Sequence, residues 1–459
     1  MRNLLRQNPW FFVWATLAAL ALRLFFLLKF PQVTADSAFY ADLAKNWLVH
    51  GVYGLSGEGG QVAPTFARLP GYPAFLALVF AIFGLDHYRA VLGIQVVVDV
   101  ATCLVIADLA RRSISDRAAK AAFGLAALCP FLAQYAAAAL TETLEIFFTA
   151  LAMDLAATGL DRLDQGNIQF WLGCGTSVAA CILLRPDGGL LLMAVGTYLG
   201  IVLLRRQRAG VSALPVVRAG LAVAVCGLAP LGVWGMRNLR TLHRMQFLAP
   251  RYATEEGELV ASGFNRWSRT WIADYASTEE IDWNIPGDTV DASKLPSRAF
   301  DTPEQRQNTF ELFEQYNRTL RISPELDAQF AALAAERIRA HPLRYYVWLP
   351  LLKIADMWLR PRTELLPPDT RWYEFNDDPQ WIALSIGLGL VNLMYVCGAA
   401  GGLVRGQPIA WAGLGISYIV LRSLFLGTME NPESRYTLEC YPAVIVMASA
   451  LWGTVNTQQ

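Results

Sequence analysis

The stretch Trp10–Phe30, WFFVWATLAALALRLFFLLKF, decides the class of fold. A helix needs about 20 mostly apolar residues to cross a bilayer, and this stretch provides them with only two charges, Arg23 and Lys29. It is longer than the apolar part of a signal peptide, so we expect an uncleaved spanning helix, although small residues follow at Val33-Thr34-Ala35. The opening of the chain therefore predicts a helical membrane protein.

The composition of the whole chain indicates the same class. Of its 459 residues, 54% are hydrophobic and 17% are charged, whereas soluble domains carry about 25% charged residues. The 38 Lys and Arg residues equal the 38 Asp and Glu residues, so no basic excess indicates nucleic-acid binding. The seven cysteines are scattered and show no metal or disulfide spacing. We predict an all-α polytopic membrane protein.

Further apolar stretches of spanning length follow along the chain. We expect spanning helices near residues 90–110, 118–138, 143–160, 169–185, 188–204, 216–235, 380–403, 408–426 and 438–453. The segments 72–84 and 343–359 are short or interrupted, so crossing the bilayer and lying in the interface both stay open for them. In all, the sequence predicts about 10–12 transmembrane helices.

Positive charges orient these helices. Two short loops carry them, with Arg111, Arg112, Arg117 and Lys120 in one and Arg205, Arg206 and Arg208 in the other. Cytoplasmic loops are enriched in Lys and Arg, so both loops are expected inside. If segment 72–84 does not span, residues 31–89 lie outside.

The sequence predicts three parts. Residues 1–236 form an N-terminal transmembrane module whose first outer loop, 31–89, is the expected catalytic loop. Residues 237–341 are polar and contain turn signals, so we expect a small extracytoplasmic cap, with an amphipathic helix near 327–340. Residues 342–459 form the C-terminal transmembrane helices.

Ionisable residues outside the two basic loops collect on the predicted outer face. They are Asp36, Arg68, Arg89, Glu142, Arg185, Arg237 and Arg435. Charges at membrane boundaries are costly, and their gathering on one side therefore favours a function. An acid among arginines suits a phosphate substrate and a hydroxyl acceptor, since arginine binds phosphate and a carboxylate accepts a proton.

Each of these positions also has a purely structural explanation, which the sequence alone leaves open. Asp36 or Ser37 caps a helix over 39–49, and Thr141 with Glu142 caps the next one. Arg68 reaches into the lipid headgroups, and Arg185 belongs to the turn Arg185-Pro186-Asp187-Gly188. Arg237 ends a helix, and Arg435 with Tyr436 anchors the last helix at the interface.

Known catalytic motifs of other classes are missing from the sequence. It contains no HExxH, P-loop or GxSxG motif, which disfavours proteases, ATPases and serine hydrolases. The four histidines have no metal-ligand spacing. No cofactor is therefore expected.

Seven short motifs share one predicted side of the membrane. They are ADSAFYADLAKNWLVHGVYG (35–54), RLPGYPAFLALVFAIFG (68–84), HYRAVLG (87–93), ALTETLEIFF (139–148), LLRPDG (183–188), WGMRN (234–238) and SRYTLECYP (434–442). In this order they resemble the GT-C membrane glycosyltransferases of the protein mannosyltransferase and aminoarabinose transferase superfamily. The resemblance implies a GT-C fold with juxtamembrane helices in the first outer loop and a small extracytoplasmic cap.

The resemblance also implies roles for individual residues. Asp36 takes the place of the catalytic Asp, and Glu142 that of a second acid. Substrate binding is implied for Tyr40, Arg68, Arg89, Arg185, Arg237, Arg435 and Tyr436. Two departures matter: Ser37 replaces the second acid of the usual pair, and Arg68-Leu69-Pro70-Gly71 replaces the usual basic-Pro-Pro motif. The first gives a divalent metal no support, and the second leaves the acceptor open.

The function that the resemblance implies is an inverting transfer of a monosaccharide. The donor is a polyprenyl phosphate of the undecaprenyl type, and the acceptor is a hydroxyl of a glycan, lipid or protein at the periplasmic face of the inner membrane. A transporter or flippase for lipid-linked glycans is an alternative, but the inner helix halves are apolar except at Asp99, Asp108 and Asp154. An O-antigen ligase or polymerase is another; such enzymes depend on Arg and His in a large outer loop.

Overall fold

The computed structural model describes residues 1–252, 259–405 and 409–453, which group into two compact units. Unit 1 comprises Met1–Thr254, Leu393–Leu421 and Leu438–Gln459. Unit 2 comprises Glu255–Asn392 and Arg422–Thr437. Three elements contain residues of both units: α17 (Pro379–Val404), α18 (Ala412–Gly427) and η9 (Ser434–Cys440).

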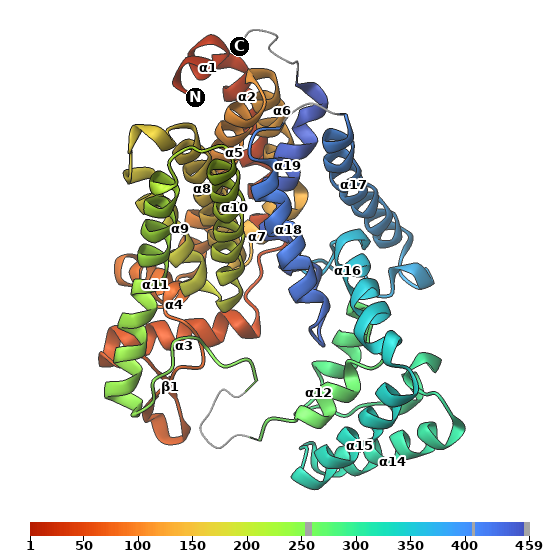
Figure 1. Ribbon diagram of the computed structural model, residues 1–459. Helices are drawn as coiled ribbons and strands as arrows, with labels where there is room; N and C mark the ends of the chain where they lie inside the picture. Colours follow the sequence, from red (N-terminus) through yellow and green to blue (C-terminus); the bar gives the residue numbers. More distant parts are fainter. Residues whose placement is uncertain (253–258, 406–408, 454–459) are drawn as a thin grey trace. The chain divides into compact units, whose positions relative to one another are not determined.

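Unit 1 is a bundle of long helices that run alongside one another, with α3 lying across one end (Figure 1). Its elements are α1 (Arg2–Gln7), α2 (Pro9–Lys29), α3 (Ala35–His50), β1 (Gly54–Ser56), η1 (Glu58–Gly60), β2 (Val62–Pro64), α4 (Gly71–Phe83), α5 (Tyr88–Ser113), α6 (Asp116–Ala127), α7 (Pro130–Ala136), α8 (Glu142–Asp161), η2 (Leu163–Gln165), α9 (Gln169–Leu184), η3 (Pro186–Gly188), α10 (Gly189–Arg208), α11 (Leu214–Leu242), α19 (Tyr441–Ser449) and η10 (Ala450–Trp452). Helix α5 packs against α2, α6 and α8, and α9 packs against α8 and α11. Strands β1 and β2 pair antiparallel, a hairpin that the sequence did not predict.

The predicted all-α polytopic membrane architecture is confirmed. Among the described residues, six helices have the length and composition to cross a bilayer: Pro9–Lys29, Tyr88–Ser113, Glu142–Asp161, Pro186–Arg208, Leu214–Leu242 and Pro379–Val404. Three apolar helices are shorter: Gly71–Phe83, Gln169–Leu184 and Ala412–Gly427. Helix α11 continues past residue 236, where the first predicted part ends.

Two predicted spans are not continuous α-helices. The stretch 118–138 is divided into α6 and α7, because Pro130 begins a new helix and has no N–H to continue the first. The stretch 438–453 contains only the short helix α19 with tighter turns on either side. Hydropathy therefore identified these stretches as apolar, but it did not predict where their helices break.

Several charged residues inside the unit 1 helices pair with one another. Arg23 Nε lies 2.6 Å from Asp99 Oδ2, and both residues are buried. Asp108 pairs with Arg111 and Arg112 of its own helix, and Arg112 also contacts Asp154 at 3.2 Å. The three aspartates that interrupted the apolar inner halves thus have cationic partners.

Unit 2 contains shorter helices around an aromatic core. Its elements are α12 (Ser262–Ser268), α13 (Tyr275–Ser277), η4 (Thr278–Asp282), η5 (Ala292–Lys294), η6 (Ser297–Ala299), α14 (Pro303–Thr319), α15 (Pro324–Ala340), η7 (Arg344–Trp348), α16 (Leu349–Leu359) and η8 (Trp372–Glu374). Trp267, Trp271, Phe313 and Phe330 pack together in its core. The predicted amphipathic segment 327–340 is part of α15, which begins at Pro324 after the capping residue Ser323.

Candidate active site

The helix that carries Asp36 starts earlier than the sequence suggested. Thr34 is its N-cap: its side chain accepts from the Ser37 N–H, and Ser37 Oγ accepts from the Thr34 N–H. The interpretation of Asp36 as the cap is therefore wrong, because a capping box from Thr34 and Ser37 already satisfies this helix end. Asp36 instead occupies the first turn of α3, where a carboxylate is favoured by the helix dipole.

Asp36 and Arg68 form a loose, partly exposed ion pair. Arg68 Nη2 lies 3.5 Å from Asp36 Oδ1, and the two side chains are 31% and 39% exposed. The Arg68 guanidinium also lies over the Phe39 ring, 4.8 Å from its centroid. The carboxylate and the guanidinium thus stand together at a face open to a ligand.

The backbone at Arg68 is held by the β hairpin between α3 and α4 and by the residues that flank this hairpin. Tyr53 Oη contacts the carbonyl oxygens of Arg68 and Leu69 at 3.0 and 3.2 Å. Arg237 on α11 donates to the Tyr53 carbonyl at 2.6 Å and to the Thr65 carbonyl at 2.8 Å. Arg237 lies within α11, so the interpretation that it ends a helix is wrong. The Arg237 guanidinium holds the two ends of the hairpin together, and Tyr53 in turn holds the backbone at Arg68.

Glu142 and Arg185 meet in a second, more buried cluster. Arg185 Nη1 lies 3.5 Å from Glu142 Oε1, and Arg185 Nε lies 3.6 Å from Glu145 Oε2 and 3.1 Å from Asp187 Oδ1. Glu142 and Glu145 are buried. Thr141 is the N-cap of α8 and Glu142 lies in its first turn, as the structural interpretation expected, but Thr141 makes no side-chain capping hydrogen bond. One guanidinium is shared by three carboxylates.

Tyr40 connects the two clusters. Its ring packs edge-on against Tyr72, with centroids 5.1 Å apart. Burial raises the pKa of Tyr40 to about 12; Arg68 and Arg185 oppose the shift, while Asp36 and Glu142 add to it. All four charged groups are therefore close enough to act on one phenol, which stays protonated at neutral pH. Five predicted site residues gather here.

Three other predicted residues belong to neither cluster. Arg89 is exposed at the start of α5 and makes no hydrogen bond or ion pair with the residues that the structure describes. Arg435 and Tyr436 belong to unit 2. There Arg435 Nε lies 2.6 Å from Glu433 Oε2, and Tyr436 Oη donates to Glu433 Oε1 at 2.5 Å.

Sequence reasoning missed three contributors to this site. Glu145 lies one helical turn after Glu142 on α8, a spacing that places both on one face. Asp187 was quoted only as part of a turn, which does form as η3. Tyr53 gave no signal, because its role depends on contacts with residues far along the chain.

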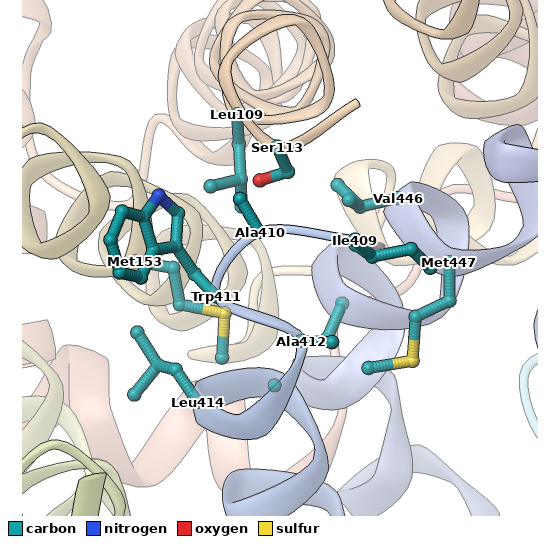
Figure 2. Close-up of a pocket in the computed structure, with 12 residues that line it drawn as sticks. Leu109, Ser113, Met153, Ile409, Ala410, Trp411, Ala412, Leu414, Val446 and Met447 are labelled. Atoms are coloured by element: carbon teal, nitrogen blue, oxygen red, sulfur yellow. The ribbon is translucent and has the colours of Figure 1, made fainter. Parts of the chain in front are cut away.

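One cavity of unit 1 is not part of this site. A cavity of about 30 Å³ is lined by Leu109, Ser113, Met153, Trp411 and Met447, among others (Figure 2). Its lining includes no ionisable side chain. The cavity therefore offers no acid or base, and the Asp36 and Arg185 clusters remain the candidate site.

A comparison with protein families matches the part of the chain that contains Arg68, Glu142 and Arg185. Residues 64–234 match the family model described as dolichyl-phosphate-mannose-protein mannosyltransferase. Over these residues the chain is similar to that glycosyltransferase family. The matched region contains Arg68, Arg89, Glu142 and Arg185, and the predicted family resemblance is confirmed.

Solved structures of membrane glycosyltransferases are similar to the chain at low identity. Archaeal oligosaccharyltransferase AglB from Archaeoglobus fulgidus, in complex with an inhibitory peptide and a dolichol-phosphate, is 12% identical, with a TM-score of 0.49 over 97% of this chain and 50% of that one. ArnT from Cupriavidus metallidurans, bound to undecaprenyl phosphate, is 13% identical, with a TM-score of 0.38 over 96% of this chain and 77% of that one. The chain spans about half the length of AglB. No curated protein sequence matches it.

The two clusters bring carboxylates and guanidinium groups within about 4 Å of one another. Among the described residues, no group of three or more Asp, Glu, His or Cys side chains is arranged to hold a metal ion. In the Glu142 cluster the guanidinium of Arg185 already lies between the carboxylates.

Proposed function

We propose that this multi-pass membrane protein is an inverting glycosyltransferase. It moves a monosaccharide from a polyprenyl phosphate, of the undecaprenyl type, to an acceptor hydroxyl on a glycan, lipid or protein. The observation that carries the proposal is the open Asp36–Arg68 pair, which adjoins the region matched to a lipid-phosphate sugar transferase family. The positive-inside rule favours the periplasmic face of the inner membrane as the site of reaction.

Asp36 is the proposed general base. Its carboxylate accepts the proton of the acceptor hydroxyl while the hydroxyl oxygen forms a bond to the anomeric carbon of the sugar. The bond from that carbon to the phosphate oxygen breaks, and the electron pair leaves with the lipid phosphate. Attack opposite to the leaving group inverts the anomeric centre.

Arg68 is the proposed partner of the leaving phosphate. A guanidinium offers several N–H donors, and it binds phosphate more strongly than it binds a carboxylate 3.5 Å away. When phosphate engages Arg68, its hold on Asp36 weakens and the carboxylate turns to the acceptor. Arg89, exposed and near the same outer loop, is a second proposed phosphate contact.

The Arg185 cluster is proposed to shape the sugar site. Three carboxylates around one guanidinium give this cluster a net negative charge, and Glu142 faces Tyr40. Such groups accept hydrogen bonds from sugar hydroxyls and keep Arg185 oriented. Glu142 is thus a proposed second catalytic acid, and Tyr40 and Arg185 are proposed substrate contacts.

The other predicted residues divide into two roles. Arg237 acts through Tyr53, so we propose that it positions the loop without contacting substrate. Arg435 and Tyr436 remain proposed substrate contacts, and unit 2 is proposed to select the acceptor.

The test is a transfer assay with the purified full chain in liposomes. Polyprenyl-phosphate sugars with a radiolabelled sugar are supplied with a panel of glycan, lipid and peptide acceptors, and labelled product and released polyprenyl phosphate are measured. The Asp36→Asn variant is expected to lose turnover by about 10²–10⁴-fold while donor binding survives, because it removes only the base. Asp86→Asn is the matched control, since Asp86 is an outer-loop acid paired with Lys45.

Two results contradict the proposal. Near-normal turnover in Asp36→Asn removes Asp36 from the base role. Labelled donor that crosses the membrane without loss of its sugar indicates a transporter instead.

A further inference from the structure

A second, larger cavity of unit 1 lies between α9 and α11, with a volume of about 670 Å³. Its walls come from Ile168, Trp171 and Leu172 at the start of α9 and from one face of α11, between Pro215 and Cys226. Residues 163–167, which connect α8 to α9, close one end.

The way the two helices touch explains the cavity. At Gly175 an added Cβ would lie 2.7 Å from the Cβ of Cys226, so α9 and α11 are in closest contact there. The cavity begins beside Cys226 and continues toward the starts of both helices, where Trp171 is the buried floor. A groove is therefore left where the two helices no longer touch.

The walls of the groove are apolar and exposed. Ile168 and Leu172 are each 42% exposed, and Leu221 and Val225 are 63% and 56% exposed. Leu221 and Val225 are four residues apart and so lie one above the other on α11. Because α11 is long and apolar enough to span a bilayer, its exposed apolar side chains contact lipid. A lipid acyl chain can lie along Leu221 and Val225.

The mouth of the groove is cationic. Arg218 lines it, is exposed, and makes no hydrogen bond or ion pair with the part of the chain that the structure describes. The other charged lining residue, Asp164, is neutralised by Arg206, whose Nη2 lies 2.5 Å from Asp164 Oδ1. A cation without a partner therefore faces the groove, and the local acid does not repel an anion.

The surrounding loops add to this positive charge. The two loops at this end, together with the helix ends that flank them, carry five arginines (162, 205, 206, 208 and 218) and two aspartates (161 and 164). Basic pockets between spanning helices on the cytoplasmic side bind anionic lipid headgroups. The excess of positive charge at this end therefore favours an anionic lipid over a zwitterionic lipid in the groove.

The groove is remote from the candidate active site. Ile168 precedes α9 and Arg185 follows it, so a helix of 16 residues, about 24 Å long, separates them. This distance is close to the thickness of the bilayer core, which places the groove at the opposite membrane face.

We propose that this groove binds an anionic glycerophospholipid of the bilayer. Its phosphate contacts Arg218, and one acyl chain lies along Leu221, Val225 and Leu172. The lipid fills the gap between α9 and α11 and so stabilises the helix whose far end leads to Arg185.

Native mass spectrometry of the detergent-solubilised full chain tests this proposal. Phosphatidylglycerol, phosphatidylcholine and undecaprenyl phosphate are added in turn, and the lipid-bound fraction is measured against concentration. Wild type is expected to bind phosphatidylglycerol at least about tenfold more tightly than phosphatidylcholine. The net negative charge of phosphatidylglycerol balances the charge of Arg218, whereas phosphatidylcholine has no net charge. Arg218→Gln is expected to remove that preference.

Two further variants complete the design. Arg208→Gln removes an exposed arginine at the same end that does not line the groove, so it should leave the preference unchanged. Ala222→Phe fills the groove and should lower the binding of both phospholipids. Equal binding of the two phospholipids, or equal losses in Arg218→Gln and Arg208→Gln, would overturn the proposal. Binding of undecaprenyl phosphate that is tighter than that of phosphatidylglycerol and that both Arg218→Gln and Ala222→Phe remove would also overturn it, because the groove would then hold a substrate lipid.

Discussion

Two acid–arginine pairs in unit 1 have the same chemistry but different surroundings. Arg23 and Asp99 are 2.6 Å apart and buried in the helix bundle. Arg68 and Asp36 are 3.5 Å apart and about one third exposed. Arg23 also donates to the carbonyl oxygens of Ala126, at 3.0 Å, and Ala127, at the end of α6.

The difference separates a structural pair from a reactive one. Every side of the Arg23 guanidinium is occupied by protein, so no substrate group has access to it. The Arg68 guanidinium contacts one carboxylate at long distance and one aromatic face, and it donates one hydrogen bond to the Ala67 carbonyl at 3.3 Å. Its other N–H groups are left for a ligand. Burial and saturation of the donors, more than residue type, therefore distinguish the two roles.

Breaking the buried pair should have the largest effect on stability. Arg23→Met leaves Asp99 buried without its cation and is expected to destabilise the fold by about 3–5 kcal/mol. The double variant Arg23→Met, Asp99→Leu is expected to recover most of that loss, because neither charge remains to be solvated. Thermal unfolding in detergent measures both. Equal destabilisation in the single and double variants would contradict a paired role.

Breaking the open pair of Arg68 and Asp36 should weaken donor binding more than it lowers stability. Arg68→Ala is expected to weaken binding of the polyprenyl-phosphate sugar by about 1.5–3 kcal/mol, since a charged hydrogen bond to phosphate is lost. Its stability should change by no more than about 1 kcal/mol, as for an exposed ion pair. Isothermal titration with the donor lipid, with Lys45→Ala as an outer-loop control, measures the difference. Unchanged donor affinity would assign Arg68 to the headgroup region.

The smallest expected effect comes from the support beneath Arg68. Tyr53→Phe removes the hydroxyl that contacts the Arg68 and Leu69 carbonyls but keeps the ring between Trp47 and Trp234. We expect about 0.5–1.5 kcal/mol weaker donor binding, seen as a higher KM with little change in kcat. Tyr88→Phe is the control, because its hydroxyl makes no hydrogen bond with the described residues. A fall in kcat at constant KM would show that Tyr53 acts on the chemistry and not on Arg68.

The sequence predicted the helical membrane class well because hydropathy is a property of each segment alone. Helices α2, α5, α8, α9 and α10 lie within a few residues of their predicted stretches. The break before Pro130 was missed because the apolar run continues through it. For the site, the sequence singled out Asp36, Arg68, Glu142 and Arg185, which do gather around Tyr40. It missed the Thr34 cap and the Tyr53 support, because cap geometry and tertiary hydrogen bonds leave no periodic signal.

The pairing of Arg23 with Asp99 has a consequence for how the chain enters the membrane. The two residues are 76 positions apart, and ribosomes add about 5–20 residues per second. An arginine at the centre of a spanning helix costs about 2.5–3.5 kcal/mol on its own, which is an upper value for Arg23 because it lies beyond the middle of α2. We expect α2 to integrate poorly until α5 has been synthesised, roughly 4–15 seconds later at those speeds. Insertion of α2 into the membrane is then a cooperative step that α5 completes.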